Sequence, residues 1–413
     1  MPILRELLQD SRDGEWGKGE GFAGGVEMAV IRGTDFASVR VGDVGRVPVR
    51  YLLGKHAARK VLRPWDILLE TAGGTSDQPT GRTLLLTPSL LEAFILPVTC
   101  ASFARFLRIC PGKADPSFVF WLLQNEYISG HIRKFHTQHT GVARFQFTIF
   151  ADTHQLVLPE RAVQESIAAF LSAFDSLIEV NHRRIAILEE MARRLFDDAM
   201  GPEVAGAGSR ELEIPLPPAW SRRGLYDVAE VTFGFPFKSN LFGTAELGMR
   251  VVRIRDIPAG RTTTWTTEAC DARYEVCNGD ILIGMDGNFH TDIWSGGPAL
   301  LNQRVTLLRP KPGRSTLWLL RAVVPSIRHL EATITGTTVA HLSARDLRAL
   351  ELACPPPNVQ QRLDQLLGPI GEQVVGLKVA NQKLTRARDL LLPKLISGEI
   401  TVGLAERDLE DAA

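Results

Sequence analysis

The sequence predicts an α+β fold in which one unit, a mixed α/β domain followed by a long helix, occurs twice. Three observations predict it. Short motifs recur in the same order in the two halves, two segments repeat apolar residues at helical spacing, and short β-rich runs alternate with Gly, Pro and Asp turns. We therefore expect two domains with curved β-sheets, separated by two long antiparallel coiled-coil helices and related by a pseudo-twofold internal duplication.

The duplication is visible as four motifs. The first half contains MAVIRGTDF (28–36), WDILL (65–69), HTGVARFQF (139–147) and LVLPERAVQESI (156–167). Their counterparts, in the same order, are MRVVRIRDI (249–257), GDILI (279–283), ITGTTVAHL (334–342) and LACPPPNVQQRL (352–363). A solenoid repeats roughly every 20 to 50 residues, so a separation of nearly half the chain favours two large copies.

Each copy begins with a domain of mixed structure. Runs such as VEMAVIRG, DILLET, GDILIGM and QRVTLLRP read as strands between turns, and SFVFWLLQNEYI (117–128) reads as a helix packed on them. We place the domains at 1–158 and 221–357, the first helix at 159–200 and the second at 358–400. A Gly/Pro-rich linker (201–220) joins the copies, and 401–413 is expected to be a frayed acidic tail.

Two heptad-like patterns predict the helices. In the first helix the predicted stripe is Val163, Ile167, Phe170, Phe174, Leu177, Asn181, Leu188, Met191 and Leu195, with a gap at Arg184. In the second it is Leu363, Leu366, Ile370, Val374, Leu377, Asn381, Leu384, Leu391 and Leu395, with a gap at Arg388. Asn181 and Asn381 both lie on it, where a polar residue can fix the register of paired helices. Gln164 and Gln360 are 196 residues apart but the asparagines are 200 apart, which indicates one four-residue stutter.

Composition narrows the function without choosing it. The 413 residues are 45% hydrophobic and 23% charged, typical of a globular protein, and no apolar run is long enough for a membrane span. The N-terminus has no secretory signal pattern, which predicts a cytoplasmic protein. The 47 basic and 47 acidic residues argue against non-specific coating of nucleic acid but not against sequence-specific binding. Five scattered cysteines without a CxxC pair indicate neither a disulfide framework nor a zinc site.

No catalytic constellation is recognisable. The chain has no GxxxxGK[ST] phosphate loop, no HExxH motif and no Asn/Asp-Pro-Pro-aromatic motif of adenine methyltransferases. Gly19–Gly24 matches GxGxxG only formally, because it lies in a Gly-rich loop and opens no helix. We therefore expect no metal, no cofactor and no catalysis by this chain.

Three motifs resemble type I restriction–modification specificity subunits. GFPFKS (234–239) with the following LF and RVVRIRDI resembles the start of a target-recognition domain. GDILIGMDGNF (279–289) and GGPALLNQRV (296–305) are similar to its middle, and RDLLLPKLISGEI (388–400) is similar to the family's C-terminal region. With the duplication, the resemblance covers essentially the whole chain. The first domain departs from it, because GKGEGFAGG (17–25) stands where the second has FPFKS.

The resemblance implies a non-catalytic subunit that binds one bipartite, asymmetric double-stranded DNA site, with each target-recognition domain recognising one half. It also implies that the helices set the spacing between the halves and dock two adenine-N6 methyltransferase subunits, with endonuclease/translocase subunits joining the complex. S-adenosylmethionine and ATP would belong to those partners. About 35 helical residues span on the order of 50 Å, which is enough to hold two target-recognition domains roughly one DNA turn apart.

Residue chemistry suggests which side chains contact DNA. Arginine can fork onto guanine and Asn or Gln onto adenine, whereas lysine suits phosphates. In the second domain the candidates are Lys238, Ser239, Arg253, Arg255, Asn288, His290, Gln303 and Arg304. In the first domain they are Arg32, which matches Arg253 or its neighbour, and the basic cluster Lys55, His56, Arg59, Lys60 and Arg63. Asp66 and Asp280 are expected to end turns before buried strands.

Two other classes of function stay open on the sequence alone. Zero net charge suits a non-enzymatic scaffold whose tandem domains and coiled coil bind other proteins. A fused methyltransferase-type enzyme is the third alternative, and it requires that the isolated chain bind S-adenosylmethionine.

Overall fold

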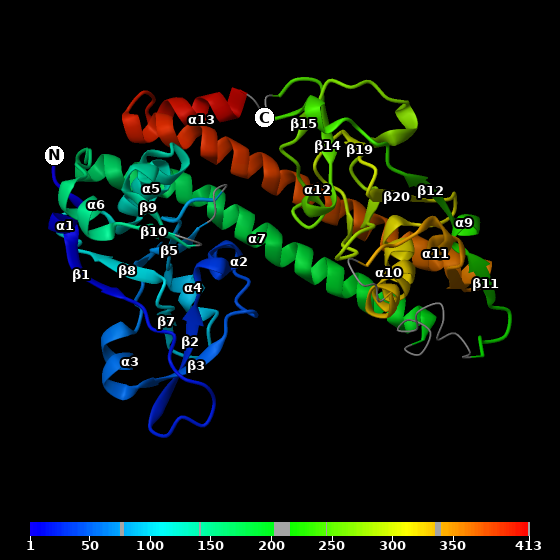
Figure 1. Ribbon diagram of the computed structural model, residues 1–413, viewed down its shortest axis with the longest axis horizontal. Coiled ribbons are helices and arrows are strands. Elements are labelled where there is room, and N and C mark those ends of the chain that lie inside the picture. Colours follow the sequence, from blue (N-terminus) through cyan, green and yellow to red (C-terminus); the bar gives the residue numbers. More distant parts are fainter. Residues whose placement is uncertain (75–77, 140–141, 202–214, 245, 335–339, 412–413) are drawn as a thin grey trace. The chain divides into compact units, whose positions relative to one another are not determined.

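A computed structural model (Figure 1) describes all residues except 75–77, 140–141, 202–214, 245, 335–339 and 412–413. The chain forms two compact units: unit 1 contains Met1–His182 and Lys383–Ala413, and unit 2 contains Arg183–Gln382. Each unit holds one mixed α/β domain and one part of each of two long helices, α7 (Arg161–Met200) and α12 (Pro357–Ser397). The predicted α+β class with long helices is confirmed.

The domain of unit 1 is built from short elements. They are α1 (Leu4–Leu7), β1 (Leu8–Asp13), β2 (Gly25–Ile31), η1 (Gly33–Asp35), α2 (Phe36–Arg40), β3 (Val49–Leu53), α3 (Gly54–Lys60), β4 (Ile67–Glu70), β5 (Ala72–Gly74), β6 (Thr83–Leu85), α4 (Pro88–Glu92), β7 (Val98–Cys100), β8 (Ala104–Ile109), α5 (Pro116–Ile128), η2 (His131–Phe135), β9 (His136–His139), β10 (Val142–Phe145) and α6 (Phe147–Thr153). The main sheet has the order β1-β8-β4-β6, and β3-β2-β7 and β5-β10-β9 form two smaller sheets.

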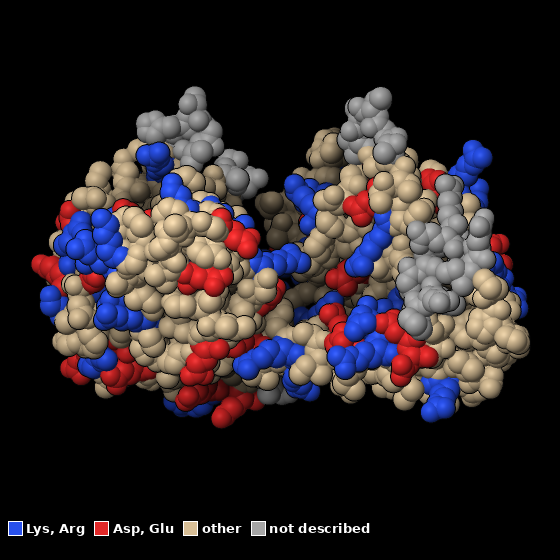
Figure 2. Space-filling model, turned by 90° about the horizontal axis from the view of Figure 1, so that it is seen from below, with Lys and Arg blue, Asp and Glu red and all other residues tan. Residues whose placement is uncertain are grey.

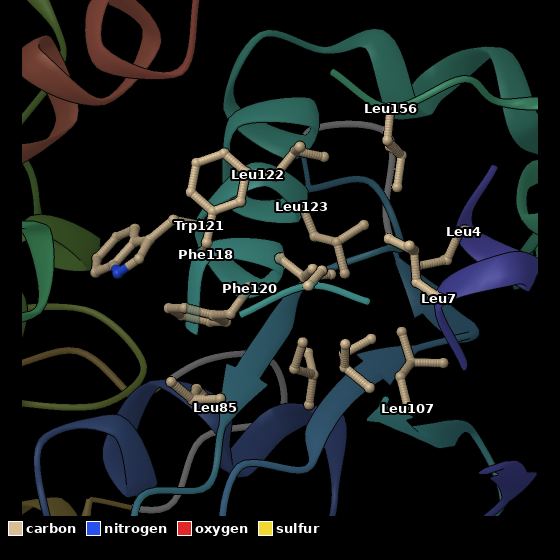
Figure 3. Packing of buried hydrophobic residues seen from close by; sticks show 14 of the residues in the cluster. Leu4, Leu7, Leu85, Leu107, Phe118, Phe120, Trp121, Leu122, Leu123 and Leu156 are labelled. Carbon is tan, nitrogen blue, oxygen red and sulfur yellow. The ribbon is translucent and has the colours of Figure 1, made fainter. Parts of the chain in front are cut away.

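Helix α5 covers the main sheet of unit 1. Asp115 caps it, accepting a hydrogen bond from the Phe118 amide at 2.8 Å, and Pro116 sits in the first turn, where its missing N–H costs nothing. Every residue from 118 to 124 is buried, so this part of α5 is buried all round and the helix is not amphipathic. Phe118 and Leu123 belong to one buried core with Leu4 of α1 and Leu107 of β8, and Figure 3 shows part of this core.

The domain of unit 2 repeats this plan. Its elements are β11 (Ser221–Gly224), α9 (Leu225–Val228), β12 (Ala229–Phe233), η3 (Ser239–Leu241), β13 (Phe242–Gly243), β14 (Met249–Val252), η4 (Ile254–Asp256), β15 (Trp265–Thr266), η5 (Ala272–Tyr274), β16 (Glu275–Val276), β17 (Ile281–Gly284), β18 (Thr291–Ile293), β19 (Ala299–Leu301), β20 (Val305–Pro310), α10 (Thr316–Thr333), α11 (Ala344–Arg348) and β21 (Glu351–Cys354). The sheet order β12-β20-β17-β18 matches β1-β8-β4-β6, and β14 runs parallel to β19 as β2 does to β7.

The two long helices run antiparallel inside each unit. In unit 1 the N-terminal part of α7, with Ile167 and Leu171, shares a core with Leu392 and Leu395 near the C-terminus of α12. In unit 2 the C-terminal part of α7, with Phe196 and Met200, shares a core with the start of α12. In both units, therefore, α7 and α12 pair in antiparallel directions.

The buried stripe on the helices differs from the predicted one. Val163, Leu177 and Met191 of α7 are 45%, 47% and 47% exposed, and Leu366 of α12 is 44% exposed. Their buried neighbours are Gln164, Ile178, Ala192 and Leu367. Each domain packs on the flank of the helices, as the Trp121 indole shows by donating to Ser172 Oγ at 3.0 Å. Because the domain also covers the helices, their buried face is displaced from the stripe that faces only the other helix. A seven-residue pattern describes only that stripe.

Three polar residues of the long helices are buried along the stripe: Asn181, Asn381 and Arg388. Asn181 and Asn381 are 4% and 7% exposed. Arg388, predicted as a gap, is instead buried: it pairs with Asp389 at 2.7 Å and with Asp175 of α7. Asp175 also pairs with Arg40 of α2 at 2.7 Å. This network joins the domain of unit 1 to both of its helices by charges that are costly to leave unpaired.

The last residues are not frayed, contrary to expectation. Val402–Asp411 form α13, whose Ala405 is fully buried in the core of unit 1 together with Leu392 and Leu395 of α12. The acidic side chains that suggested a tail lie on the exposed side of this short helix. Among the described residues, no helix is both long and apolar enough to cross a membrane.

Candidate nucleic-acid interface

In unit 2, five strand ends and the loops that join them meet at one end of the main sheet. Phe233 at the end of β12 pairs with Thr306 near the start of β20, and Gly284 at the end of β17 pairs with Val305. The parallel strands β14 and β19 end alongside, because the Asn302 amide donates to Val252 O at 3.3 Å. We call the loops 234–239, 253–256, 285–290 and 302–304 the second loop edge.

All eight candidates of the second domain lie on this second loop edge, two on each loop: Lys238 and Ser239, Arg253 and Arg255, Asn288 and His290, Gln303 and Arg304. All eight side chains are at least partly exposed. Six of them are exposed: Lys238, Ser239, Arg255, Asn288, Gln303 and Arg304. The structure thus brings together side chains that are up to 66 residues apart in the chain (Lys238 to Arg304).

Local ion pairs hold some of these side chains. Arg304 lies 3.3 Å from Asp286, whose other oxygen is 2.6 Å from His341 Nδ1. Arg253 lies 3.4 Å from Asp256. Asn288 and His290 border a cavity of about 440 Å³ that also reaches Arg321 and Glu331. Arg255 and Gln303 are exposed on the same edge.

Hydrogen bonds show that unit 1 has an equivalent edge. The Gly14 amide donates to Ala104 O at 2.8 Å, as the Gly234 amide does to Val305 O at 3.0 Å. Thr71 donates to Phe103 O at 2.8 Å, as Met285 does to Arg304 O at 3.0 Å. Ala101 donates to Ile31 O at 2.9 Å, as Asn302 does to Val252 O. We call the segments 14–18, 32–35, 71–74 (which includes β5) and 101–103 the first loop edge.

This equivalence changes which segment of the first domain corresponds to FPFKS (235–239) in the second domain. A Cβ on Gly14 would lie 2.1 Å from Cys100 O, and a Cβ on Gly234 would lie 1.9 Å from Asn302 O, so both positions require glycine. Counting from these glycines, GEWGKG (14–19) corresponds to GFPFKS (234–239), and exposed Lys18 corresponds to Lys238. The Gly-x-x-x-Lys spacing could have revealed Lys18, which the sequence reasoning missed.

Arg32 and Arg253 are equivalent, as predicted. Each precedes a short 3₁₀ helix, and the backbone amide of each donates at 2.9 Å to the aspartate three residues later, Asp35 or Asp256. Arg32 also pairs with Asp35 through its guanidinium at 2.7 Å. Both arginines therefore lie at their loop edge with part of their hydrogen-bonding capacity already used.

The basic cluster of the first domain is divided. Lys60 is 3.0 Å from Glu15 and donates to Gly14 O at 3.2 Å, and His56 also pairs with Glu15, so these two cations are engaged. Lys55, Arg59 and Arg63 are exposed. Helix α3 follows β3, whose Leu53 pairs with Gly25 at the start of β2. Lys55 therefore lies at the opposite end of β2 from Arg32.

Asp66 and Asp280 have matching structural roles. The Arg108 guanidinium holds both oxygens of Asp66 at 2.8 and 2.7 Å, and the Arg309 guanidinium holds Asp280 at the same two distances. These hydrogen bonds raise the pKa of each arginine. Asp66 and Asp280 also accept the amides of residues 63 and 277, which ends the turn before β4 and β17.

The site offers donors and charges rather than reactive groups. No cluster of three His, Cys, Asp or Glu side chains that could hold a metal occurs in the part of the chain that the structure describes. Burial raises the pKa of the Cys100 thiol to about 12, so it is protonated at neutral pH and a poor nucleophile. On the face drawn in Figure 2, lysine and arginine alternate with aspartate and glutamate over each unit. This mixture suits local, specific contacts better than a continuous basic field.

Comparison with known proteins finds similarity to two type I restriction enzyme specificity subunits. The specificity subunit of the type I restriction enzyme EcoBI from Escherichia coli is 33% identical over 188 residues, which cover 44% of this chain and 40% of that protein. The specificity subunit of the enzyme MjaIX from Methanocaldococcus jannaschii is 25% identical over 272 residues, which cover 60% of this chain and 61% of that protein. The chain is a relative of type I restriction enzyme specificity subunits.

Solved structures agree with this kinship at the level of the fold. The crystal structure of a type I restriction–modification S subunit from M. genitalium superposes with a TM-score of 0.56 at 15% identity, covering 95% of this chain and 94% of that one. No model of a known protein family matches the chain. Because the alignments reach only 40% and 61% of the length of these two specificity subunits, the relationship is firm for part of their length.

Proposed function

We propose that this chain is the DNA-recognising specificity subunit of a type I restriction–modification complex in the cytoplasm. Each domain recognises one half of a bipartite, asymmetric duplex site through its loop edge. The chain carries out no catalysis and binds no cofactor. It delivers the site to two adenine-N6 methyltransferase subunits and, when they are present, to endonuclease/translocase subunits.

The observation that carries this proposal is the equivalence of the two loop edges. Six backbone hydrogen bonds, three in each unit, hold equivalent loops at the equivalent end of the sheet in each unit. The backbone plan is shared while the exposed side chains differ, as with Phe103 and Arg304. One scaffold with two different sets of exposed side chains suits one protein that recognises two different half-sites.

The helices support a role as spacer and docking surface. Forty residues of α7 span about 60 Å, more than one DNA turn of about 34–36 Å. On the side away from its buried stripe, α7 exposes Leu177, Val180, Ile187 and Met191, each by 43% or more. Exposed apolar residues at helical spacing are typical of protein-binding faces, which suits docking of the methyltransferase subunits.

The direct test is adenine-methylation mapping of the host genome, with and without the gene for this chain. The proposal requires one asymmetric bipartite motif that disappears with the gene. A gel-shift series with the methyltransferase subunit should then show binding to that motif over a scrambled duplex and a steep loss of affinity as salt rises. Equal binding to both duplexes, or capture of proteins alone, would favour the scaffold function. S-adenosylmethionine binding by the isolated chain in calorimetry would favour an enzyme.

Exchanging the second domain is expected to change one half-site only. Replacing residues 222–357 with those of a homologue that recognises a different sequence leaves α7, most of α12 and the first loop edge intact. Methylation mapping should then give a motif with one new half, one old half and the original spacing. A change in both halves would contradict independent recognition by the two domains.

Lysine contacts to phosphates make a second prediction from the same loops. Lys238→Ala should weaken binding about equally for all sequences and reduce the slope of log affinity against log salt by about 1. Lys18→Ala should do the same, because Lys18 is its counterpart in unit 1. Lys60→Ala is the matched control, since Lys60 is held by Glu15. A salt slope that Lys18→Ala leaves unchanged would remove Lys18 from the interface.

A further inference from the structure

The two loop edges differ at the turn that precedes β8 in unit 1 and β20 in unit 2, each a central strand of its main sheet. In unit 2 this turn presents Gln303 and Arg304 before β20, and in unit 1 it presents Ser102 and Phe103 before β8. The carbonyls of Phe103 and Arg304 accept equivalent hydrogen bonds from Thr71 and Met285. Phe103 therefore occupies the position of Arg304, with an aromatic ring in place of a guanidinium.

The Phe103 side chain is not needed for the core. It is 60% exposed, whereas its chain neighbour Ala104 is fully buried. A large aromatic side chain held on a rigid turn and left in solvent suits contact with another molecule. The turn itself is fixed on both sides, since Ala104 donates to Ala101 O at 2.9 Å and Thr71 donates to Phe103 O.

A second aromatic residue lies beside it. The Trp16 amide donates to Ser102 Oγ at 3.2 Å, and the Arg50 guanidinium lies over the Trp16 ring at 4.7 Å from its centroid. Trp16 is 38% exposed. The first loop edge thus carries two exposed aromatic rings, with Arg50, Arg32 and Lys18 as cations nearby, where the second carries Gln, Arg, Asn and His.

We propose, on the basis of the function proposed above, that Phe103 recognises thymine in the half-site of the first domain by packing against its C5-methyl group. In the major groove thymine is the base that presents a methyl group, and an apolar side chain is the partner that such a group selects. The flanking cations favour a polyanionic partner such as DNA over an apolar protein surface. The first half-site is therefore recognised partly by apolar contact and the second by hydrogen bonds.

Deoxyuridine provides the test, because it removes the methyl group and nothing else. The probe is a duplex that carries the site found by methylation mapping, bound by the chain with its methyltransferase subunit. The half assigned to the first domain is the one that the domain exchange leaves unchanged. Each thymine in that half is replaced in turn by deoxyuridine. At one position the wild-type affinity should fall about fourfold, the value of one buried methyl group.

The Phe103→Ala variant separates this contact from others. It should bind the thymine duplex several-fold less tightly and should no longer distinguish thymine from deoxyuridine at that position. Arg304→Ala is the matched control at the equivalent position of unit 2, and it should keep the wild-type sensitivity. Because Phe103 is mostly exposed, the midpoint temperature of thermal unfolding of Phe103→Ala should equal that of the wild type within experimental error.

Several results would overturn the inference. These are a first half-site without an A·T pair, no position sensitive to deoxyuridine, and unchanged sensitivity in Phe103→Ala. Loss of methyltransferase binding by Phe103→Ala, with DNA discrimination intact, would assign Phe103 to a protein contact instead. A wild-type complex that discriminates no duplex would overturn the proposed function itself, which is a separate result.

Discussion

A chain with four residues inserted into each long helix, after His182 in α7 and after Gln382 in α12, is expected to lose its natural site. At these two points the chain passes from one compact unit to the other, so the contacts inside each unit are kept. Four helical residues add about 6 Å, close to two base-pair steps. Affinity for the natural site should fall about 10³-fold, towards the level of non-specific binding.

The same variant should gain a new site. Methylation mapping should find both original halves with a longer spacer between them, because neither loop edge has changed. Four residues inserted after Gly313, in an exposed turn between β20 and α10, are the control and should leave the motif unaltered. Altered half-sites with an unchanged spacer would count against the spacer model.

The second large effect is expected in the folding of unit 1. Asp66→Ala should lower its free energy of unfolding by about 3–5 kcal/mol, because it leaves the Arg108 guanidinium without a counter-ion. The Asp66 side chain is 0% exposed and that of Arg108 is 15% exposed, so water replaces little of the lost interaction. The variant also removes the acceptor for the Arg63 amide. Hydrogen exchange of the β4 and β8 amides measures the change within this unit.

The duplicated domain provides the control for this prediction. Asp280→Ala breaks the equivalent pair, but Asp280 and Arg309 are 10% and 37% exposed at their side chains. Water can solvate the arginine that remains, so a smaller loss, roughly half, is expected in the β17 and β20 amides. Equal losses in the two units, or a loss below about 1 kcal/mol in unit 1, would show that burial does not set the strength of these pairs.

Much of the fold could be predicted because it depends on patterns within short segments. Apolar periodicity located α7 and α12, and the repeated motifs around Asp66 and Asp280 gave the duplicated sheets. The third pair of motifs was less informative, since 140–141 and 335–339 lie outside the described residues. The helix stripe was displaced by one residue at Val163, Leu177 and Met191, because packing of the domains on the helices is not encoded in a heptad.

The candidate site was predicted unevenly. The second domain carries motifs that resemble those of type I specificity subunits, which pointed to eight candidates, and the structure places all of them on one loop edge. The first domain lacks the motifs, so the sequence did not point to Lys18 or Phe103, which the structure places on the first loop edge, nor to the ion pair of Lys60 with Glu15. Glu15 and Lys60 are 45 residues apart in the chain, and nothing in either segment indicates that they meet.

The sequence by itself determined the fold class, the internal duplication, the two long helices and the kinship with type I specificity subunits. The first three follow from spacing and composition, which act within a helix turn, a strand or a hairpin, whereas the kinship rests on the resemblance of short motifs to those of known specificity subunits. Only the tertiary structure decided that Lys18 corresponds to Lys238 and Phe103 to Arg304. Those equivalences rest on hydrogen bonds between backbone segments far apart in the chain, such as Thr71 to Phe103 and Met285 to Arg304. Backbone hydrogen bonds do not depend on side-chain identity, so they persist where sequence similarity has been lost.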